Sequence, residues 1–314
     1  MSLLLATTGW HVEDWRERFQ ALLPDMPIVI LGEAFDRRSV HYVASWKHPE
    51  GSLAGLPNLA AIFSLGAGVD FLFADSRLPE APIARIVDPD LTTRMSEYIL
   101  LHCLRYLRQQ PRYDRQKLEG VWDDDRNQPA AKSVRVGIMG MGELGQDAAR
   151  KLQIMGFDVA GWSRSPKSID GLATFAGEES MAAFLARTDI LVCLLPLTDD
   201  TRGILNMQLF SGLARDGRLG GPFLINAGRG GLQVEDDILA ALNDGTLQGA
   251  TLDVFVTEPL PADSPLWKQP ALTITPHNAA MSEPEAIAGQ VAAQIRRLEA
   301  GEPLQNVVDP ARGY

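Results

Sequence analysis

Short apolar stretches recur along the chain and alternate with segments whose apolar side chains have helical spacing. The stretches are rich in β-branched residues, and alternation of this kind predicts parallel sheets covered by helices. The expected strands cover a segment at the N-terminus and the ranges 27–32, 59–65, 134–139, 158–162, 190–195, 222–226, 249–254 and 272–275. The pattern therefore predicts an α/β protein.

Two helical segments indicate how the chain divides. Apolar residues have helical spacing over 96–107, and Pro111 interrupts the pattern. A later helix is expected to begin with Ser282 as its N-cap and to stop at Gly301, after which the chain returns to the first lobe. We predict a substrate domain of residues 1–95 with 284–314 and a dinucleotide-binding domain of residues 96–283.

A length of 314 residues suits two domains of ordinary size, and a composition that is 46% hydrophobic and 22% charged is typical of a globular protein. The expected architecture is two doubly wound, Rossmann-like domains with parallel sheets and a cleft between them. The first domain is expected to be flavodoxin-like and discontinuous.

The formal net charge of -11 argues against nucleic acid or an anionic membrane as a partner. An anionic ligand must then be bound by local positive groups. The N-terminal stretch has neither a basic leader nor the length of a membrane span. Cys103 and Cys193 lie far apart without metal-ligand spacing, so we expect no metal site, no disulfide and a reducing cytoplasm.

A glycine-rich segment, GMGELG, follows one expected strand and precedes an expected helix. In a dinucleotide-binding turn the first glycine permits the tight turn, the second admits the pyrophosphate, and the third allows close helix packing. The helix N-terminus adds unpaired N–H groups for the phosphates. The alternative is a plain turn between a strand and a helix. We predict cofactor contacts at Gly140, Gly142, Glu143, Leu144 and Gly145.

The end of the next strand decides between NAD and NADP. An NAD-specific site places Asp or Glu there to bind the ribose 2'-hydroxyl, whereas this chain has Ser163, Arg164 and Lys167. Asp158 begins the strand, several residues from the binding edge. Arginine can bind a 2'-phosphate bidentately, so we predict NADP(H) in preference to NAD(H). A solvated basic loop is the alternative.

Three further segments present polar side chains after expected strands: Arg229 in INAGRGG, Glu258 in TLDVFVTEPLP and His277 in TPHNAA. The carboxyl ends of parallel strands meet at one edge of a sheet, where doubly wound folds bind ligands. We therefore expect these residues to converge. A surface arginine, a solvated glutamate and a histidine in a capped loop are the alternatives for each residue taken alone.

These motifs resemble those of the D-specific 2-hydroxyacid dehydrogenases, and within them the glyoxylate/hydroxypyruvate reductase A type. The resemblance covers nearly the whole chain, because several independent motifs occur in the family's order. They are SLGAGVD at 64–70, GIMGMGELG at 137–145, LLPLTDDTRGILN at 194–206, NAGRGG at 226–231, TLDVFVTEPLP at 251–261, PLWKQPALTITPH at 265–277 and ARGY at 311–314.

The resemblance implies catalytic roles that agree with the chemistry of the residues. The matched arginine, Arg229, holds the substrate carboxylate, for which a planar guanidinium is suited. The matched histidine, His277, is the acid/base that protonates the oxygen as hydride reaches the carbonyl carbon. Glu258 supports it, because a carboxylate on the other ring nitrogen favours the charged imidazole.

Supporting roles follow from the same resemblance. The backbones of Leu65 and Gly66 are expected to meet the substrate carboxylate. Trp46 is expected to be an aromatic wall of the substrate pocket, with ordinary packing as its alternative. The remaining expected cofactor contacts are Leu195, Pro196, Ala227 and Asp253, where the strand-end Asp253 is equally able to cap a turn.

The resemblance implies an NADPH-dependent reductase that converts glyoxylate to glycolate and hydroxypyruvate to D-glycerate, in a homodimer formed through the cofactor domain. A reductase or dehydrogenase for another D-2-hydroxy acid and a non-catalytic dinucleotide-sensing protein are the alternatives. Asn278 and Ala279 depart from the family's usual pattern after the histidine, which leaves the preferred substrate open.

Overall fold

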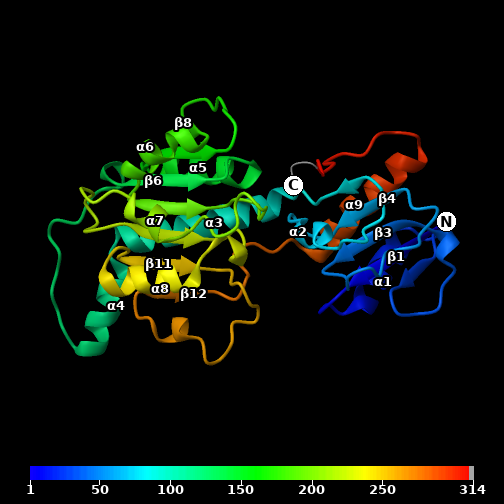
Figure 1. The fold of residues 1–314 in the computed structure, drawn as a ribbon, viewed down its shortest axis with the longest axis horizontal. Helices are drawn as coiled ribbons and strands as arrows, with labels where there is room; N and C mark the ends of the chain where they lie inside the picture. Colours follow the sequence, from blue (N-terminus) through cyan, green and yellow to red (C-terminus); the bar gives the residue numbers. More distant parts are fainter. Residues whose placement is uncertain (311–314) are drawn as a thin grey trace. The chain divides into compact units, whose positions relative to one another are not determined.

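The computed structural model describes residues 1–310, and the chain divides into two compact units (Figure 1). One unit comprises Met1–Leu91 with Ser282–Tyr314, and the other comprises Thr92–Met281. Each unit has its own parallel sheet and its own core, and each is described by itself below. The ARGY motif at 311–314 lies outside the described residues.

The first unit contains a five-stranded parallel sheet with the order β2-β1-β3-β4-β5. This is the flavodoxin-like order, so the prediction for this unit is confirmed. Side chains alternate between the faces of β1: Leu3 and Leu5 pack under helices α1 and α9, while Leu4 packs on the other face. The elements are β1 (Ser2–Thr7), α1 (Val12–Leu22), β2 (Ile28–Ile30), η1 (Arg37–Ser39), β3 (Val40–Trp46), β4 (Ala61–Ser64), α2 (Asp70–Phe73), β5 (Ile83–Ala84) and α9 (Pro284–Glu299).

Three features of this unit differ from the expectations. Strand β3 is the central strand of the sheet and β5 is an edge strand, but neither segment was among the expected strands. The expected N-cap of α9 was wrong: Glu283, not Ser282, is the N-cap residue, and the buried Oγ of Ser282 has no hydrogen-bond partner among the described residues. Pro284 is the cause, because a proline at the first helical position restricts the preceding residue to extended backbone.

The second unit contains a seven-stranded parallel sheet with the order β12-β11-β10-β9-β6-β7-β8. Its first strand, β6, lies inside the sheet, so the direction of winding reverses between β6 and β9. The crevice outside the carboxyl ends of the strands at such a reversal is where doubly wound sheets bind ligands. The predicted Rossmann-like fold is confirmed.

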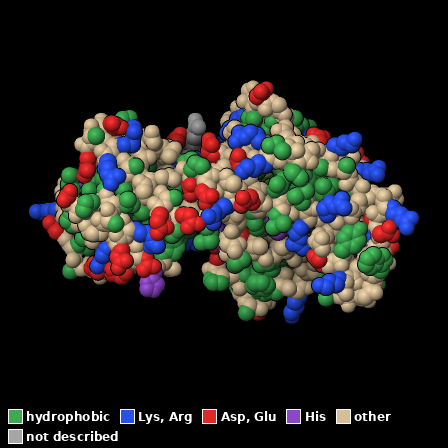
Figure 2. Space-filling view, turned by 180° about the vertical axis from the view of Figure 1, so that it is seen from behind, with side chains coloured by type: hydrophobic (Ala, Val, Ile, Leu, Met, Phe, Trp, Pro, Cys, Tyr) green, Lys and Arg blue, Asp and Glu red, His purple; other side chains and the backbone are tan. Residues whose placement is uncertain are grey.

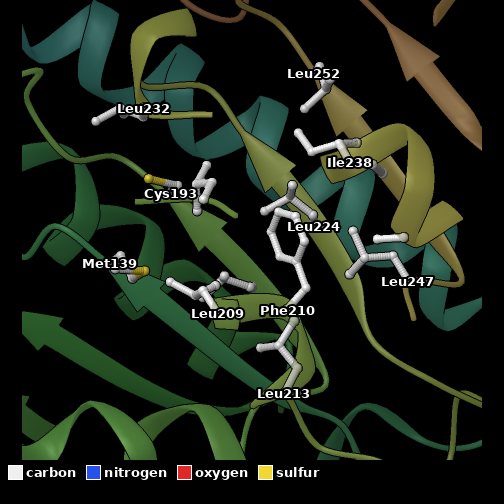
Figure 3. Packing of buried hydrophobic residues seen from close by; sticks show 14 of the residues in the cluster. Met139, Cys193, Leu209, Phe210, Leu213, Leu224, Leu232, Ile238, Leu247 and Leu252 are labelled. Atoms are coloured by element: carbon white, nitrogen blue, oxygen red, sulfur yellow. The ribbon is translucent and has the colours of Figure 1, made fainter. Parts of the chain in front are cut away.

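Two apolar cores cover the faces of this second sheet. Side chains of α6, α7 and α8 pack on one face, where Phe210 and Leu224 are fully buried (Figure 3). Side chains of α3 and α5 pack on the other face, together with Ile225. Leu224 and Ile225 are neighbours on β10, so the alternation along this strand fills both cores.

The chain passes from the first unit to the second within α3. The elements of the second unit follow in chain order. They are α3 (Pro89–Leu107), α4 (Gln110–Glu119), η2 (Ala131–Ser133), β6 (Arg135–Met139), α5 (Glu143–Ile154), β7 (Asp158–Ser163), β8 (Ala173–Ala176), η3 (Glu178–Ser180), α6 (Met181–Ala186), β9 (Ile190–Cys193), α7 (Met207–Ser211), β10 (Phe223–Asn226), η4 (Gly230–Leu232), α8 (Glu235–Asp244), β11 (Gly249–Leu252), η5 (Pro265–Lys268) and β12 (Leu272–Ile274).

Both cysteines are free and buried, Cys103 on α3 and Cys193 on β9. Burial raises the pKa of the Cys193 thiol to about 12, which keeps it protonated and unreactive. Within residues 1–310, no cluster of three or more His, Cys, Asp or Glu side chains has the arrangement of a metal site. None of the helices in that part of the chain combines the length and the apolar character needed to cross a membrane.

Candidate active site

The glycine loop lies between β6 and α5, next to the reversal point of the sheet. Gly140 has a φ of +104°, and a Cβ placed there would lie 2.6 Å from the carbonyl oxygen of Leu194. A Cβ at Gly145 would lie 1.9 Å from the carbonyl oxygen of Gly140, so this glycine allows the helix to pack against the turn. A Cβ at Gly142, the N-cap residue of α5, would meet nothing within 4 Å among the described residues.

The three glycines therefore serve different purposes, as the dinucleotide-binding turn requires. The open space at Gly142 lies where the first N–H groups of α5 are available to a phosphate. Glu143 and Leu144 form the first turn of this helix, with Leu144 packed against the core. The residues present fit a bound dinucleotide at this point.

The basic loop follows β7 at the same edge of the sheet. Ser163 ends the strand and its hydroxyl donates to the carbonyl of Ser165 at 2.9 Å. Lys167 Nζ donates to the carbonyl of Met141 in the glycine loop at 2.7 Å. Arg164 is half exposed, and its guanidinium lies 3.5 Å from a carboxylate oxygen of Asp200. Lys167 thus ties the basic loop to the glycine loop, while Arg164 extends into solvent.

Asp158 does not lie at this edge. It is the first residue of β7, and its carboxylate lies 2.7 Å from the Arg187 guanidinium. Because β7 runs parallel to β6, Asp158 is at the opposite end of the strand from the glycine loop. The carboxyl end of β7 therefore carries Ser163 and Arg164, without an acidic side chain on the strand's last residue.

His277 and Glu258 form a side-chain pair. The imidazole Nδ1 lies 2.8 Å from Glu258 Oε2, while Glu258 Oε1 accepts a hydrogen bond from the backbone N–H of Phe255 at 3.1 Å. Both side chains are partly exposed, at 35% for His277 and 25% for Glu258. Since Nδ1 is engaged by the carboxylate, Nε2 is the nitrogen that remains to exchange a proton with a ligand.

The backbone of His277 has a φ of +53°, a left-handed conformation that non-glycine residues rarely adopt. Asp253, which is 2% exposed, holds this conformation in place. Its carbonyl accepts from the N–H of His277 at 2.8 Å, and its carboxylate accepts from the N–H groups of Asn278 and Ala279, each at 3.0 Å. Asp253 therefore caps the histidine loop, as the alternative interpretation of this residue anticipated.

A buried polar network lies beneath this loop. Thr275 donates its hydroxyl to Asp253 Oδ1 at 2.6 Å, and the Tyr98 hydroxyl of α3 lies 2.8 Å from Thr275 Oγ1. Burial raises the pKa of Tyr98, so its hydroxyl remains protonated. Burial, with a further contribution from Arg105, lowers the pKa of His102 to about 4, and this neutral ring lies 4.4 Å from the Tyr98 ring. This part of the network carries no charge near neutral pH.

Arg229 lies on the loop after β10. Asn226, which is fully buried, accepts from the Gly228 N–H at 3.1 Å and donates to the Arg229 carbonyl at 3.2 Å. The Arg229 guanidinium donates to the carbonyl of Gly228 at 2.8 Å. A Cβ at Gly230 would lie 1.9 Å from the carbonyl oxygen of Phe255. The arginine loop is therefore packed directly against the segment whose Phe255 N–H donates to Glu258.

Leu195 connects the glycine loop and the arginine loop. It follows β9 and is 7% exposed. Its N–H nitrogen would lie 3.0 Å from a Cβ at Gly140, and its carbonyl oxygen would lie 3.0 Å from a Cβ at Gly228. Ala227 is buried beside these groups in the core, and the carbonyl of Pro196 accepts from the Thr201 hydroxyl at 2.7 Å. The loops after β6, β9 and β10 thus lie close together.

The expected substrate contacts of the first unit lie at the carboxyl ends of β3 and β4. A Cβ at Gly66 would lie 2.4 Å from the Trp46 ring. The Trp46 ring stacks on Trp10 with centroids 5.2 Å apart, so packing accounts for part of its burial. The Leu65 N–H donates to the Ser45 carbonyl at 3.0 Å and is committed to the sheet. The Gly66 N–H donates a longer hydrogen bond, 3.3 Å, to the Ser64 hydroxyl, so both backbone N–H groups expected to meet a carboxylate have partners within the first unit.

Sequence reasoning did not identify Tyr98, Asn226 and Gln233, whose side chains support the loops of the site. Tyr98 lies within the expected helix of residues 96–107, Asn226 ends an expected strand, and Gln233 lies in the loop that follows. Their type and spacing carry no signal, because their partners come from other elements of the fold.

A dinucleotide-type glycine loop together with an imidazole–carboxylate pair on one parallel sheet defines a nicotinamide-dependent oxidoreductase. Residues 100–279 match the family model of the D-isomer specific 2-hydroxyacid dehydrogenase NAD binding domain. That is more than half of the chain, and the chain belongs to this family. The predicted family membership and the predicted class of enzyme are confirmed.

Individual relatives match over the full length. The chain is 42% identical over 322 residues to glyoxylate/hydroxypyruvate reductase A of Serratia proteamaculans (strain 568), with 100% of each chain covered. A probable 2-hydroxyacid dehydrogenase from Rhizobium etli CFN 42, solved with NADP, HEPES and L(+)-tartaric acid, has a TM-score of 0.94 and 45% identity, with 100% and 99% covered. The NADPH-dependent glyoxylate/hydroxypyruvate reductase of Sinorhizobium meliloti, solved with NADP and sulfate, has a TM-score of 0.93 and 45% identity, with 100% of each covered.

Proposed function

We propose that this protein is an NADPH-dependent reductase of small 2-oxo acids, with glyoxylate and hydroxypyruvate as substrates and glycolate and D-glycerate as products. The observation that carries the proposal is the His277–Glu258 pair, on the same sheet as a glycine loop that fits a dinucleotide. The names of the Serratia and Sinorhizobium relatives support the choice of substrates.

The cofactor is NADP(H), held by the glycine loop and the basic loop. The N-terminus of α5 and the open space at Gly142 receive the pyrophosphate. Arg164 and Ser163 bind the 2'-phosphate, and Lys167 adds positive charge beside the glycine loop. Three relatives crystallised with NADP or NADPH support this assignment. When bound, NADPH supplies hydride to the carbonyl carbon of the substrate.

His277 is the proton donor. As negative charge develops on the substrate oxygen, a proton on Nε2 neutralises it, and Glu258 stabilises the imidazolium through Nδ1. The hydrogen bonds of Asp253 fix the backbone around His277, so the imidazole is held in one orientation before substrate binds.

Arg229 binds the substrate carboxylate. A guanidinium is always charged and offers two parallel donors to a carboxylate, which orients the 2-oxo group toward the cofactor. Acidic and basic side chains are interspersed on the face shown in Figure 2, and the chain has a net charge of -11. A small anion therefore depends on a specific local cation.

The test of this function is the oxidation of NADPH and of NADH by the wild-type protein with a panel of 2-oxo acids, followed by nicotinamide absorbance. We expect NADPH with glyoxylate or hydroxypyruvate to give the highest kcat/KM. Faster turnover of a bulkier 2-oxo acid would instead assign another D-2-hydroxy acid. Binding of NADPH without turnover of any member of the panel would indicate a non-catalytic sensing protein.

We also propose a cytoplasmic homodimer formed through the second unit. The apolar side of α3 faces the core, because its residues Ile99, Cys103 and Tyr106 are buried. Exposed apolar side chains lie instead at the end of α4 and just after it, where Leu118 is 88% and Trp122 is 98% exposed. These are better candidates for a subunit contact. Light scattering of Trp122→Ser should show a larger fraction of monomer than light scattering of the wild type.

A further inference from the structure

Two buried side-chain amides lie between the arginine loop and the loop that carries Glu258. Gln233 is 3% exposed and Asn226 is fully buried. Asn226 Nδ2 donates to Gln233 Oε1 at 2.8 Å, and the same Nδ2 donates to the Arg229 carbonyl at 3.2 Å. One end of the Gln233 amide is therefore bound to the residue that fixes the Arg229 backbone.

The other end of the amide is bound to the segment after β11. Gln233 Nε2 donates to the carbonyl of Val254 at 2.9 Å. The next two residues of this segment also donate to acidic side chains: Phe255 N–H to Glu258 at 3.1 Å, and Val256 N–H to Glu235 at 2.8 Å. The backbone that orients Glu258 is thus anchored by both Gln233 and Glu235, and Gln233 Nε2 also donates to Glu235 Oε1 at 3.4 Å.

The two loops touch without space between them. A Cβ at Gly230 would lie 1.9 Å from the Phe255 carbonyl oxygen and 2.6 Å from the Val256 nitrogen. Since no side chain fits there, a shift of either loop must move the other. Buried amides are costly to leave without partners, so the Asn226–Gln233–Val254 connection favours a single relative position of the two loops.

We propose that Gln233 is a positioning residue that holds Arg229 and the Glu258–His277 pair in register with each other. It touches neither substrate nor cofactor in this assignment, and it acts through the two loops. The inference rests on the proposed function, in which Arg229 binds the substrate carboxylate and His277 donates the proton.

The test is Gln233→Met, which keeps the length of the side chain and removes its hydrogen bonds. We expect KM for hydroxypyruvate to rise about ten-fold and kcat to fall, because both the carboxylate site and the proton donor lose their alignment. The pH-rate profile should shift as well, since Glu258 is less firmly held. The dissociation constant of NADPH should stay within about two-fold of the wild type, because the glycine loop is unaffected.

The matched control is Gln294→Met on α9 of the first unit. Gln294 is also buried, and its amide both donates to and accepts from the backbone of Gln305 at 3.0 Å. This variant should lose thermal stability to a similar extent and keep wild-type KM and pH-rate profile. If Gln233→Met does not fold, Gln233→Asn keeps an amide that is one methylene too short to span both loops, and it should change KM and the pH profile in the same direction.

The inference is overturned if a folded Gln233 variant has wild-type KM and pH-rate profile, or if Gln294→Met changes them equally. Arg229→Gln and His277→Gln, measured in the same assay, separate the two levels of the argument. If they lose turnover while Gln233→Met does not, only the role of Gln233 fails. If they turn over substrate like the wild type, the proposed function itself fails.

Discussion

The catalytic loops and the basic loop lie at the same edge of the second sheet, yet they are built differently. The loops that carry Arg229, Glu258 and His277 are fixed by hydrogen bonds from buried groups, among them Asp253. In the basic loop, Arg164 is 51% exposed, and its guanidinium lies 3.5 Å from the carboxylate of Asp200, which is 76% exposed.

The difference follows from the task of each loop. Proton transfer and carboxylate binding require groups held close to one geometry, because small displacements cost large factors in rate. Recognition of a 2'-phosphate requires mainly charge and donors that can close on the ligand, which an exposed arginine supplies. Substitutions in the catalytic loops should therefore change turnover, whereas substitutions in the basic loop should change the choice of cofactor.

The largest effect is expected for Arg229→Gln. Removing the charge that binds the substrate carboxylate should lower kcat/KM for hydroxypyruvate by about a thousand-fold. Arg229→Lys keeps the charge without the planar fork and should be intermediate. Steady-state kinetics with NADPH measures both. A change of less than about three-fold in Arg229→Gln would remove this residue from the substrate site.

Arg164→Asp should reverse the cofactor preference. A carboxylate repels the 2'-phosphate and can accept from a ribose hydroxyl, so the ratio of kcat/KM for NADPH over NADH should fall by about a hundred-fold. Turnover at saturating NADH should remain near the wild-type value. An unchanged ratio would show that the basic loop takes no part in cofactor selection. The proposed difference in task between the catalytic loops and the basic loop would then be wrong.

Glu258→Gln should reduce turnover by about ten-fold and shift the pH-rate profile. The carboxylate stabilises the protonated imidazole, and reduction requires that protonated form. Glu235→Gln separates anchoring from pairing, because Glu235 anchors the same backbone through the Val256 N–H but is not paired with His277. A profile in Glu258→Gln that superimposes on the wild type would contradict the role of the carboxylate.

Tyr98→Phe should have the smallest effect, a decrease in kcat of a few-fold. It removes one hydroxyl from the network below Asp253 and leaves the Thr275 bond to Asp253 in place. The pH-rate profile should not move, because neither Tyr98 nor the neutral His102 changes charge near neutral pH. Thr275→Val, which removes the hydroxyl closer to the carboxylate, should have the larger effect of the two.

Much of the fold could be predicted from local pattern. The strands β6, β9, β10 and β11 are each a continuous apolar segment followed at once by a turn or loop, and the glycine loop directly follows β6. Each of these signals can be read from adjacent residues. Two of the three missed strands carry little signal: β5 spans only Ile83–Ala84 and β8 is a partly exposed edge strand, so neither shows a sustained pattern. The third is β3 (Val40–Trp46). Ser282 was predicted to cap α9, and the restriction imposed by Pro284 proved decisive.

The candidate residues of the site were also predicted, but their supports were not. Arg229, Glu258 and His277 stand out because each lies in the loop that follows an apolar strand. Gln233 and Tyr98 gain their roles only when the fold brings Val254 and Thr275 to them. The Leu65 N–H was predicted to meet a substrate, but it donates to the Ser45 carbonyl in the sheet. That hydrogen bond depends on strand register, which the sequence pattern did not specify.

The measurement that tests the central claim most directly is a single-turnover reduction of hydroxypyruvate by His277→Gln with bound NADPH, alongside a titration of NADPH binding. We expect the rate of the chemical step to fall by about a thousand-fold while NADPH binds as tightly as to the wild type. A wild-type rate in this variant, or a loss of rate explained entirely by weaker NADPH binding, would contradict the assignment of His277 as the proton donor.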